Sequence, residues 1–417
     1  MSGVICAAVR DLDPKVGGAE MSLTTLLRGL VEDGPIFENA PEYIPFIQAK
    51  EDDNLEDGWQ LTIMQSNDRG NPVWSDLQGN VERISFDLPV EDIWSGLAWR
   101  FRNRKSGVRN TKLYRKHILK KNKQFEKSVL SELTSLKNRC VDENKDLIGV
   151  TQLTWSIGAC NAFRKLEIPH VIFVRDNIQI TNVELYRESL ERADVVIAAG
   201  EGLIDQLKEQ FSLRRTEIVH LPINYSSRFK SSEKVNEKIT QGIEKRAEEG
   251  SLEVPRLGIM GIVPEKGFEL YKKLIPNLEK EWPELEIHIF GEGFYIDTLK
   301  GLGNTTFHGQ TDPDVAFTMV DMHMLLVDSL GTWGRVINEA GIFKIPTLSI
   351  DIGSQREAVG RGGVIVRNDA NPNEMILKLK ELYDNRVKLG LEAQNHAKIV
   401  DHRKAISELR SIIHKIK

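Results

Sequence analysis

The sequence has 417 residues, of which 40% are hydrophobic and 28% are charged. A chain of this length can bury a sizeable core and is long enough for two domains. The formal net charge of -5 is small, which excludes a protein that binds polyanions over its whole surface.

Cysteine content and hydropathy restrict the compartment. Cys6, Cys140 and Cys160 form no CxxC pair and leave one cysteine over in any pairing, which favours a reducing environment and disfavours structural zinc. The sequence has no apolar run of about 18 residues, the length that a membrane span needs. The apolar start at 3–10 is too short for a signal peptide and lacks a basic beginning, so we expect a cytoplasmic protein.

In the first half of the chain, short apolar runs alternate with amphipathic segments, a pattern typical of a parallel sheet covered by helices. The first expected strand is at 3–10. Gly17-Gly18 then precedes a helix, in which apolar residues from Leu23 to Val31 follow i, i+3, i+4, i+7 and i+8 spacing. Further strands are expected at 61–64, 81–86, 147–150, 171–174, 195–199 and 218–221.

A polar segment at 226–250, rich in Ser, Lys and Glu, separates this half from a second alternation. The second half is expected to form strands at 256–262, 285–290, 305–308, 322–327, 347–350 and 364–366, and helices from 372 to the end. We therefore expect an α/β protein with two Rossmann-like domains that face each other across a crevice. The expected parts are an N-terminal domain at 1–225, a connecting segment at 226–250, a second domain at 251–395, and a C-terminal helix at 396–417 that packs back on the N-terminal domain.

The segment 331–340 (GTWGRVINEA) combines a glycine-bearing turn, the start of a helix and one acid a little over two turns into that helix. Backbone amides at a helix start suit a phosphate, and a carboxylate on the same helix suits a sugar hydroxyl. A nucleotide sugar carries both groups, which points to glycosyl transfer. The residues expected to bind the donor here are Thr332, Gly334, Arg335, Val336 and Glu339.

Plainer alternatives stand beside these roles. Arg335 could be an ordinary exposed helical arginine, and Glu339 an ordinary surface acid. The apolar neighbours of Glu339 favour partial burial, where an acid usually has a partner. We expect Trp333 to fill the core beneath the helix. Gly17 and Gly18 could form a simple loop, although a double glycine between a buried strand and a helix also suits a close phosphate approach.

Four further motifs are Gly17-Gly18-Ala19-Glu20, Pro264-Glu265-Lys266-Gly267, Gly291-Glu292-Gly293 and Phe307-His308-Gly309. Their order and spacing resemble those of the retaining glycosyltransferases of family four (GT4), which have the GT-B fold. The resemblance implies that 1–225 binds the acceptor and that 251–395 binds the nucleotide sugar. It also implies roles for single residues: Gly17, Gly18 and Lys266 at the donor diphosphate, Glu339 at the ribose, Gly291 at a strand end beside the donor, and His308 beside the base.

The sequence departs from the family pattern at three places. The first of two glutamates that usually lie eight positions apart falls on Gly331, and Asp328 could compensate for it. The usual arginine before the Pro264 motif is absent. Where many members place a histidine at the tip of an N-terminal strand, this chain has Arg175-Asp176-Asn177.

Glycosyl transfer from a diphosphate puts growing negative charge on the leaving phosphate, which a fixed cation stabilises. Lys266 is the first candidate for that cation. In the crevice Arg175 could orient phosphate or acceptor, and Asp176 could accept a proton from the acceptor hydroxyl; the alternative is a structural ion pair. The sequence contains no HExxH, CxxC or DxD-like metal pair, so no metal or other cofactor is expected to be obligatory.

Residues 100–139 contain fourteen Lys and Arg residues and only two acids, Glu126 and Glu132, which gives this segment a charge of 14 − 2 = +12. Such a concentration in an acidic protein favours an anionic membrane surface or an anionic acceptor, and the alternative is a solvated helical face. No aromatic-interleaved motif supports nucleic acid. The residues expected to contact acceptor or membrane are Arg115, Lys116, Lys120 and Lys121.

Together these features predict a retaining glycosyltransferase that moves a sugar from a UDP- or GDP-linked donor to a glycan or lipid-linked acceptor. The expected context is the biosynthesis of cell-surface polysaccharide or glycoconjugate, in the cytoplasm and peripherally at the inner membrane. One alternative is a degenerate GT-B protein that acts as a nucleotide- or glycan-binding partner of another transferase. A second is a different GT-B enzyme, such as an epimerase or a phosphorylase.

Overall fold

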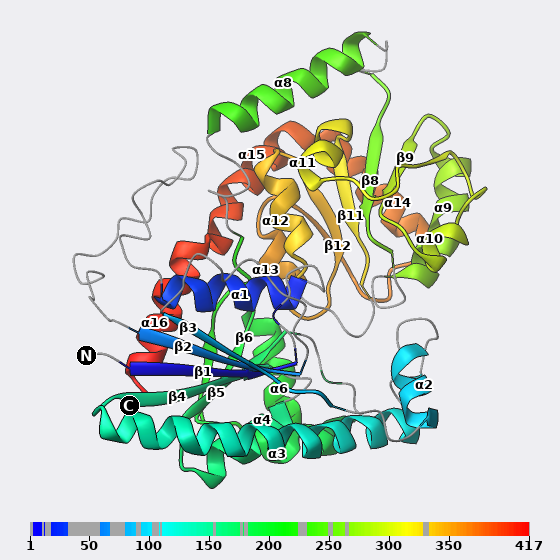
Figure 1. Ribbon diagram of the computed structural model, residues 1–417. Helices are drawn as coiled ribbons and strands as arrows, with labels where there is room; N and C mark the ends of the chain where they lie inside the picture. Colours follow the sequence, from blue (N-terminus) through cyan, green and yellow to red (C-terminus); the bar gives the residue numbers. More distant parts are fainter. Residues whose placement is uncertain are drawn as a thin grey trace. The chain divides into compact units, whose positions relative to one another are not determined.

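In the computed structural model of the protein, the residues described are 3–10, 12, 18–31, 59–66, 80–88, 93–101, 108, 111–152, 156–175, 178, 182–223, 232–248, 253–262, 267–327 and 333–416. They form two compact units. The first unit holds the described residues up to 223 and those from 402 onward, and the second holds those from 232 to 401. Each unit has its own parallel sheet (Figure 1).

The sheet of the first unit has seven strands in the order β3-β2-β1-β4-β5-β6-β7, and every neighbouring pair is parallel. Its strands are β1 (Gly3–Val9), β2 (Trp59–Gln65), β3 (Val81–Ser85), β4 (Asp146–Gln152), β5 (His170–Val174), β6 (Val195–Ala198) and β7 (Thr216–Ile218). Strand β1 is buried along its whole length, because helices cover both faces of the sheet. This double burial explains why the strands form nearly continuous apolar runs in the sequence.

Two helical layers cover that sheet. The helices are α1 (Gly18–Val31), α2 (Ile93–Phe101), α3 (Lys112–Asp142), α4 (Ser156–Lys165), α5 (Val183–Arg192), α6 (Glu201–Gln210) and α16 (His402–His414). Alternate residues of β1 face opposite layers: Ile5 belongs to a core cluster shared with α1 and α16, and Cys6 to one shared with α3 and α4. The sheet is therefore the middle of a three-layer unit.

The C-terminal helix α16 packs on α1, which confirms the expected return of the chain end to the first unit. A Cβ added to Gly29 on α1 would lie 2.1 Å from Cδ1 of Ile406 on α16, so only a glycine allows this approach without a shift of Ile406. Arg410 donates a hydrogen bond of 2.8 Å to the carbonyl of Gly29. The two helices are thus joined by packing and by one polar contact.

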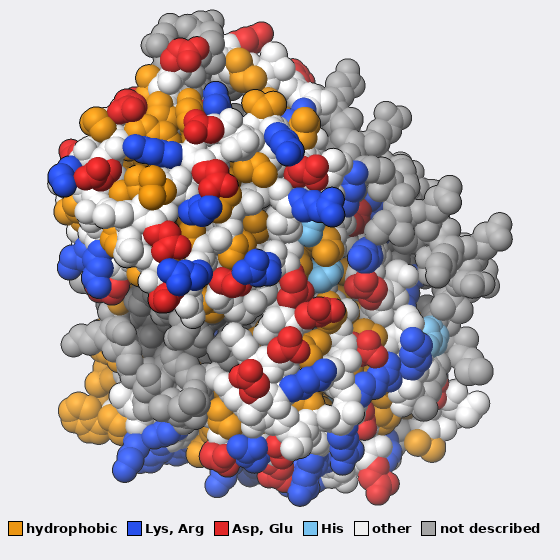
Figure 2. Space-filling model, turned by 180° about the vertical axis from the view of Figure 1, so that it is seen from behind, with side chains coloured by type: hydrophobic (Ala, Val, Ile, Leu, Met, Phe, Trp, Pro, Cys, Tyr) orange, Lys and Arg blue, Asp and Glu red, His pale blue; other side chains and the backbone are white. Residues whose placement is uncertain are grey.

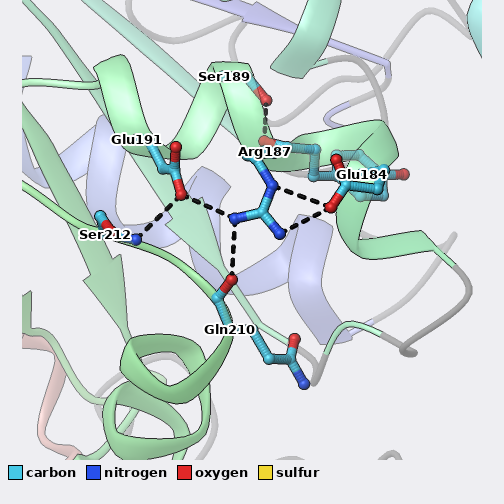
Figure 3. A network of polar contacts seen from close by, with 7 residues as sticks. Glu184, Arg187, Ser189, Glu191, Gln210 and Ser212 are labelled. Carbon is cyan, nitrogen blue, oxygen red and sulfur yellow. Dashed lines mark hydrogen bonds and ion pairs between the residues drawn. The ribbon is translucent and has the colours of Figure 1, made fainter.

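A polar network joins α5 to the end of α6 (Figure 3). The guanidinium of Arg187 donates to Glu184 at 2.7 Å, to Glu191 at 2.9 Å and to the carbonyl of Gln210 at 3.2 Å. Glu191 also accepts from the backbone amide of Ser212 at 3.0 Å. These bonds fix the segment that leads from α6 into β7.

The sheet of the second unit has six parallel strands in the order β10-β9-β8-β11-β12-β13. Its strands are β8 (Arg256–Met260), β9 (Glu286–Phe290), β10 (Thr305–Phe307), β11 (Met322–Leu325), β12 (Thr347–Ile350) and β13 (Gly363–Val366). Its helical segments are α8 (Ser232–Glu248), α9 (Phe268–Glu281), α10 (Phe294–Asp297), α11 (Pro313–Ala316), η7 (Phe317–Met319), α12 (Arg335–Ile342), α13 (Gln355–Val359), α14 (Pro372–Asp384), α15 (Arg386–His396) and η8 (Ala397–Val400).

Both sheets share one topology. The first strand lies inside, the second and third follow on one side, and the later strands lie on the other, so the order reverses between β1 and β4 and between β8 and β11. Doubly wound sheets bind ligands outside the carboxyl ends of their strands at this reversal. In the second unit, the topology therefore predicts a ligand site at the carboxyl ends of β8 and β11.

The sequence placed most strands within a few residues. The strand expected at 218–221 instead runs over Thr216–Ile218. The helical stretch expected from 372 onward is divided into α14, α15, η8 and α16, with Asn385 ending α14 and starting α15. Helix α8 lies within the polar segment at 226–250, where some helix was expected.

Candidate functional site

At the carboxyl end of β8 the chain passes through Gly261, which has a φ of 59°. Its amide donates to the carbonyl of Phe290, the last residue of β9, at 2.9 Å. Gly291 follows with a φ of 113°, and a Cβ added there would lie 3.4 Å from the Cα of Gly261. Two glycine turns thus lie in contact beside the reversal point, where a ligand can approach the backbone closely.

The turn before α9 reaches the end of β11. Gly267 has a φ of 72°, and an added Cβ would lie 2.6 Å from the carbonyl oxygen of Leu326. One turn further along α9, the hydroxyl of Tyr271 donates to the carbonyl of Met324 at 3.1 Å and accepts from the amide of Leu326 at 2.9 Å. Burial raises the pKa of Tyr271, so the phenol keeps the proton that it donates. Lys266, which precedes Gly267, lies outside the described residues.

Helix α12 begins beside the same strand end. Its N-cap, Gly334, has a φ of 72°, and an added Cβ would lie 2.7 Å from Cδ2 of Leu325, the last residue of β11. Trp333 is fully buried and donates from Nε1 to the side chain of Asn338 at 2.7 Å, which agrees with its expected place in the core. The first amides of α12, those of Arg335 and Val336, therefore lie beside the end of β11 at the reversal point.

Arg335 and Glu339 lie one helical turn apart on α12. Nη2 of Arg335 is 3.6 Å from Oε1 of Glu339, and each side chain is only 12% exposed. A cation in the first turn of a helix is opposed by the helix dipole, usually by about 0.3 to 1 kcal/mol. Arg335 is thus placed where a bound anion would relieve that repulsion, and Glu339 reaches the same side of the helix. Thr332 and Asp328 lie outside the described residues.

A second polar group lies along β9 and the end of β10. Nε2 of His308 is 2.8 Å from Nδ1 of His288, and Nε2 of His288 is 3.4 Å from Oε2 of Glu286. Arg256 on β8 donates to the same carboxylate at 2.9 Å. The ring of His308 stacks on Phe290 at 4.6 Å between centroids. A chain of four side chains thus ends at His308, one residue after β10.

Both histidines of this group have lowered pKa values. Burial, with the neighbouring His308 and Arg256, lowers the pKa of His288 to about 4, against a smaller opposing effect of Glu286. Burial, with Arg256 and Lys245, lowers the pKa of His308. At neutral pH both rings are uncharged, so each presents one N–H donor and one acceptor nitrogen.

Among the candidate residues of the first unit, Gly18 and Arg175 lie in the described ranges. Gly18 is the first residue of α1, and Glu20 in its first turn pairs with Arg10 after β1 at 2.8 Å. Arg175 follows β5, is buried, and lies over the ring of Phe173 with Cζ 4.7 Å from the centroid. Gly17 and Asp176 lie outside the described residues.

The structure brings one set of sequence candidates together and corrects another. Gly334, Arg335, Val336 and Glu339 share the start of α12, while Gly291 and His308 follow the ends of β9 and β10. Arg115, Lys116 and Lys120 lie on α3, Lys116 exposed and the other two half-buried. Lys121 was expected at the surface but is buried, with its ammonium bonded to the carbonyl of Leu88, so it belongs to the interior of the first unit.

His288 and Glu286 were not among the residues predicted from the sequence. Their spacing could have indicated the contact. Glu286 and His288 lie two residues apart on β9, so their side chains point to the same face of the sheet, and His308 follows the neighbouring strand β10. Among the described ranges, no group of three or more His, Cys, Asp or Glu side chains has the arrangement of a metal site. No helix in those ranges combines the length and the apolar character that a membrane crossing requires.

The second unit of the chain resembles a known protein family. Residues 254–385 match the family model described as "Glycosyl transferases group 1". This range includes all six strands of the second sheet and the start of α12. A search of curated protein sequences found no match.

Solved structures resemble the whole chain. A structure of Alr3699/HepE from Anabaena in complex with UDP and glucose is 13% identical with a TM-score of 0.64, and the match covers 100% of both chains. The fold is GT-B. A glycosyltransferase from Rickettsia africae is 13% identical with a TM-score of 0.63, over 100% of this chain and 98% of that one. Sucrose-phosphate synthase from Thermosynechococcus elongatus is 12% identical with a TM-score of 0.63, over 99% and 98%. At these identities the likeness establishes the GT-B architecture.

Proposed function

We propose that this GT-B protein is a glycosyltransferase that takes a sugar from a nucleotide-diphosphate donor, UDP- or GDP-linked, and transfers it to a glycan or lipid-linked acceptor. The observation that carries the proposal is the start of α12, where the first amides of the helix, Arg335 and Glu339 lie together beside the end of β11. The family match of residues 254–385 supports the reaction class. The UDP in the structure of HepE supports the kind of donor.

The chemistry follows from charge. As the bond between sugar and diphosphate breaks, negative charge grows on the leaving phosphate. The amides of Arg335 and Val336, the guanidinium of Arg335 and the ammonium of Lys266 would stabilise that charge more than they stabilise the ground state. Glu339 would accept hydrogen bonds from the ribose hydroxyls. Gly291 and His308 would border the nucleotide from the ends of β9 and β10.

The first unit would bind the acceptor. We assign 1–225 to this role and 251–395 to the donor, with 226–250 as the connection and α16 as the helix that closes on the first unit. Gly17 and Gly18 would offer amides to the diphosphate, Arg175 would orient phosphate or acceptor, and Asp176 would take the proton from the attacking hydroxyl. Retention at the anomeric carbon, membership of GT4, a role in surface polysaccharide or glycoconjugate synthesis and a peripheral cytoplasmic location complete the proposal.

A transfer assay tests this function. Radiolabelled UDP- and GDP-sugars are incubated with the protein and with lipid and glycan extracts, and label in the acceptor fraction is measured. We expect incorporation from one nucleotide class that falls at least tenfold in Glu339→Ala, with Glu279→Ala, an exposed acid on α9, as the matched control. Incorporation that is unchanged in Glu339→Ala would contradict the proposed site.

One sequence feature favours a second function. Gly331 stands where relatives place a glutamate that touches the donor sugar, so the protein could bind a nucleotide without turning it over. Tight binding of a nucleoside diphosphate, together with no transfer from any nucleotide sugar in the presence of acceptor extract, would favour this binding-partner role.

A further inference from the structure

Helix α3 extends beyond the sheet that it covers. With 31 residues it is about 46 Å long, whereas the seven residues of β4 span about 23 Å. Its last residue is followed closely by the start of β4, at the amino ends of the strands. Lys121 bonds to the carbonyl of Leu88, three residues after the end of β3, so the turns before Lys121 lie past the carboxyl ends of the strands. Helix α2 packs on this overhanging part (Figure 1).

The overhanging part of α3 has one buried and one exposed side. Its buried side chains include His117, Ile118, Lys121 and Asn122. Apart from Leu113, the exposed residues of this part and the following turn follow helical steps of three or four and form a stripe of lysine and leucine. They are Lys112, Lys116, Leu119, Lys123 and Lys127.

Large apolar side chains are exposed beside that stripe. On α2, Ile93 is 77% and Trp94 is 70% exposed, and Leu113 on α3 is 44% exposed. Figure 2 shows hydrophobic side chains at the lower left, next to Lys and Arg side chains that continue along the lower edge with Asp and Glu side chains between them. Isolated exposed apolar residues are common, but a group of them beside lysines marks an interaction surface.

The charges along α3 differ before and after residue 125. From residue 126 onward, Glu126 pairs with Lys165 at 2.7 Å and Arg139 with Glu82 at 2.6 Å. Residues 111–125 contain six basic residues and no acid. One of the six, Lys121, is used inside the unit. The exposed lysines of this stretch, Lys112, Lys116 and Lys123, lie near exposed apolar groups, which fits a partner with an anionic surface over an apolar interior.

We propose that the exposed face of α2 and the first half of α3, formed by Ile93, Trp94, Lys112, Lys116, Leu119 and Lys123 and called here the α2–α3 face, docks on an anionic lipid bilayer. Aromatic and aliphatic side chains enter the headgroup region, and lysines reach the lipid phosphates with their long stems. A bilayer satisfies both kinds of group at once, because its anionic headgroups lie directly over its apolar layer.

The position of this face has a consequence for the acceptor. The face lies past the carboxyl ends of the first sheet, which is the edge where such sheets bind ligands. A lipid-linked acceptor held in a docked membrane would therefore enter the first unit from the adjacent bilayer. This consequence rests on the proposed function, whereas the docking itself does not.

Vesicle co-sedimentation tests the docking. The full-length protein is mixed, without nucleotide, with phosphatidylcholine vesicles that either contain or lack phosphatidylglycerol. Each lysine near an anionic surface changes partitioning by about fivefold, so Lys112→Gln, Lys116→Gln and Lys123→Gln together should weaken binding on the order of a hundredfold. Lys272→Gln, Lys273→Gln and Lys388→Gln, exposed lysines of the second unit, are the matched control and should bind like the wild type.

The apolar part is tested by Ile93→Ser with Trp94→Ser, which should lower binding at least tenfold in both low and high salt, because salt screens only the charged contribution. Circular dichroism verifies that each variant is folded.

The proposal is overturned if the wild-type protein stays in the supernatant with anionic vesicles at low salt, or if the lysine triple variant sediments like the wild type. It is also overturned if sedimentation velocity shows that the α2–α3 face instead joins two copies of the chain, with Trp94→Ser yielding monomers. Nucleotide affinity, measured on the same variants, reports separately on the donor site.

Discussion

Arg335 and Glu339 lie on successive turns of α12 with Nη2 and Oε1 3.6 Å apart, and both side chains are nearly covered. Helix dipoles favour an acid in the first turn and a base in the last, and here the base comes first. The order is thus opposite to the one that would stabilise the helix by itself. It suits a ligand that brings its own negative charge to the helix start and a hydroxyl to the second turn.

This arrangement predicts that Arg335 contributes little to folding. Arg335→Gln removes an i,i+4 pair worth about 0.3 to 0.5 kcal/mol and an opposing dipole interaction of similar size. The free energy of unfolding without nucleotide should therefore change by less than about 0.5 kcal/mol, as measured by urea denaturation. The same variant should bind UDP or GDP at least tenfold more weakly. A large loss of stability with unchanged nucleotide affinity would assign Arg335 a structural role.

Gly334 should be far less tolerant of substitution. Gly334→Ala must adopt a positive φ of 72° and places its Cβ 2.7 Å from Leu325. Gly301 is a matched control, because its φ of 86° is also positive but nothing lies within 4 Å of an added Cβ. We expect Gly301→Ala to cost about 1 to 2 kcal/mol from backbone strain and Gly334→Ala at least about 1 kcal/mol more from overpacking. Equal costs in denaturant unfolding would refute the close approach of α12 to β11.

The histidine pair makes stability depend on pH. His288 has a pKa of about 4 in the folded protein and an ordinary value of 6.5 when unfolded. Below pH 6.5 the unfolded chain takes up a proton that the folded protein does not accept until about pH 4. The stabilisation from a neutral His288 is therefore complete above pH 6.5 and is lost as the pH falls towards 4, by about 3 kcal/mol at most.

Substitution of His288 isolates this contribution. His288→Phe keeps a ring beside His308 and Phe290 and should flatten the fall of unfolding free energy between pH 6.5 and 4. Because burial also lowers the pKa values of His170 and His396, the difference between variant and wild type is the quantity to measure. An identical pH profile for both proteins would show that His288 is not a buried neutral ring.

The packing of the C-terminal helix can be tested by a double-mutant cycle. Gly29→Ala forces Ile406 to move and should cost about 1 to 3 kcal/mol, and Ile406→Ala leaves a cavity and should cost about 2 to 4 kcal/mol. The double variant should cost at least about 1 kcal/mol less than the sum, because the added methyl enters the space that Ile406 leaves. Additive costs would show that α1 and α16 do not touch at this point.

Much of the fold could be predicted from local patterns. Apolar runs such as 171–174 mark strands buried on both faces, and the spacing from Leu23 to Val31 marks a helix. The strand order could not be predicted in the same way, because β1 pairs with β2 and β4, whose positions depend on contacts between distant parts of the chain. The two alternations and the polar segment at 226–250 between them indicated two domains, and the family resemblance identified the architecture as GT-B.

For the candidate site, sequence patterns located the start of α12 and His308, but they did not predict that His288 contacts His308. His288 lies within a buried apolar strand, and its contact with His308 depends on the register of β9 and β10. Lys121 was counted with the surface charges, although Ile118 three residues before and Phe125 four residues after place it on the apolar side of α3. Charge counting gives the net charge of a segment, and helical periodicity is needed to say which charges reach its surface.

The most direct test of the account is a thermal-shift panel of the wild-type protein and of Glu339→Ala against UDP, GDP, ADP, dTDP and CMP. We expect one nucleoside diphosphate to raise the midpoint of unfolding of the wild type, since a ligand that binds only the folded state stabilises it. The shift should be largely lost in Glu339→Ala and retained in Glu279→Ala. An equal shift in wild type and Glu339→Ala, or no shift with any nucleotide, would contradict a donor site at the start of α12.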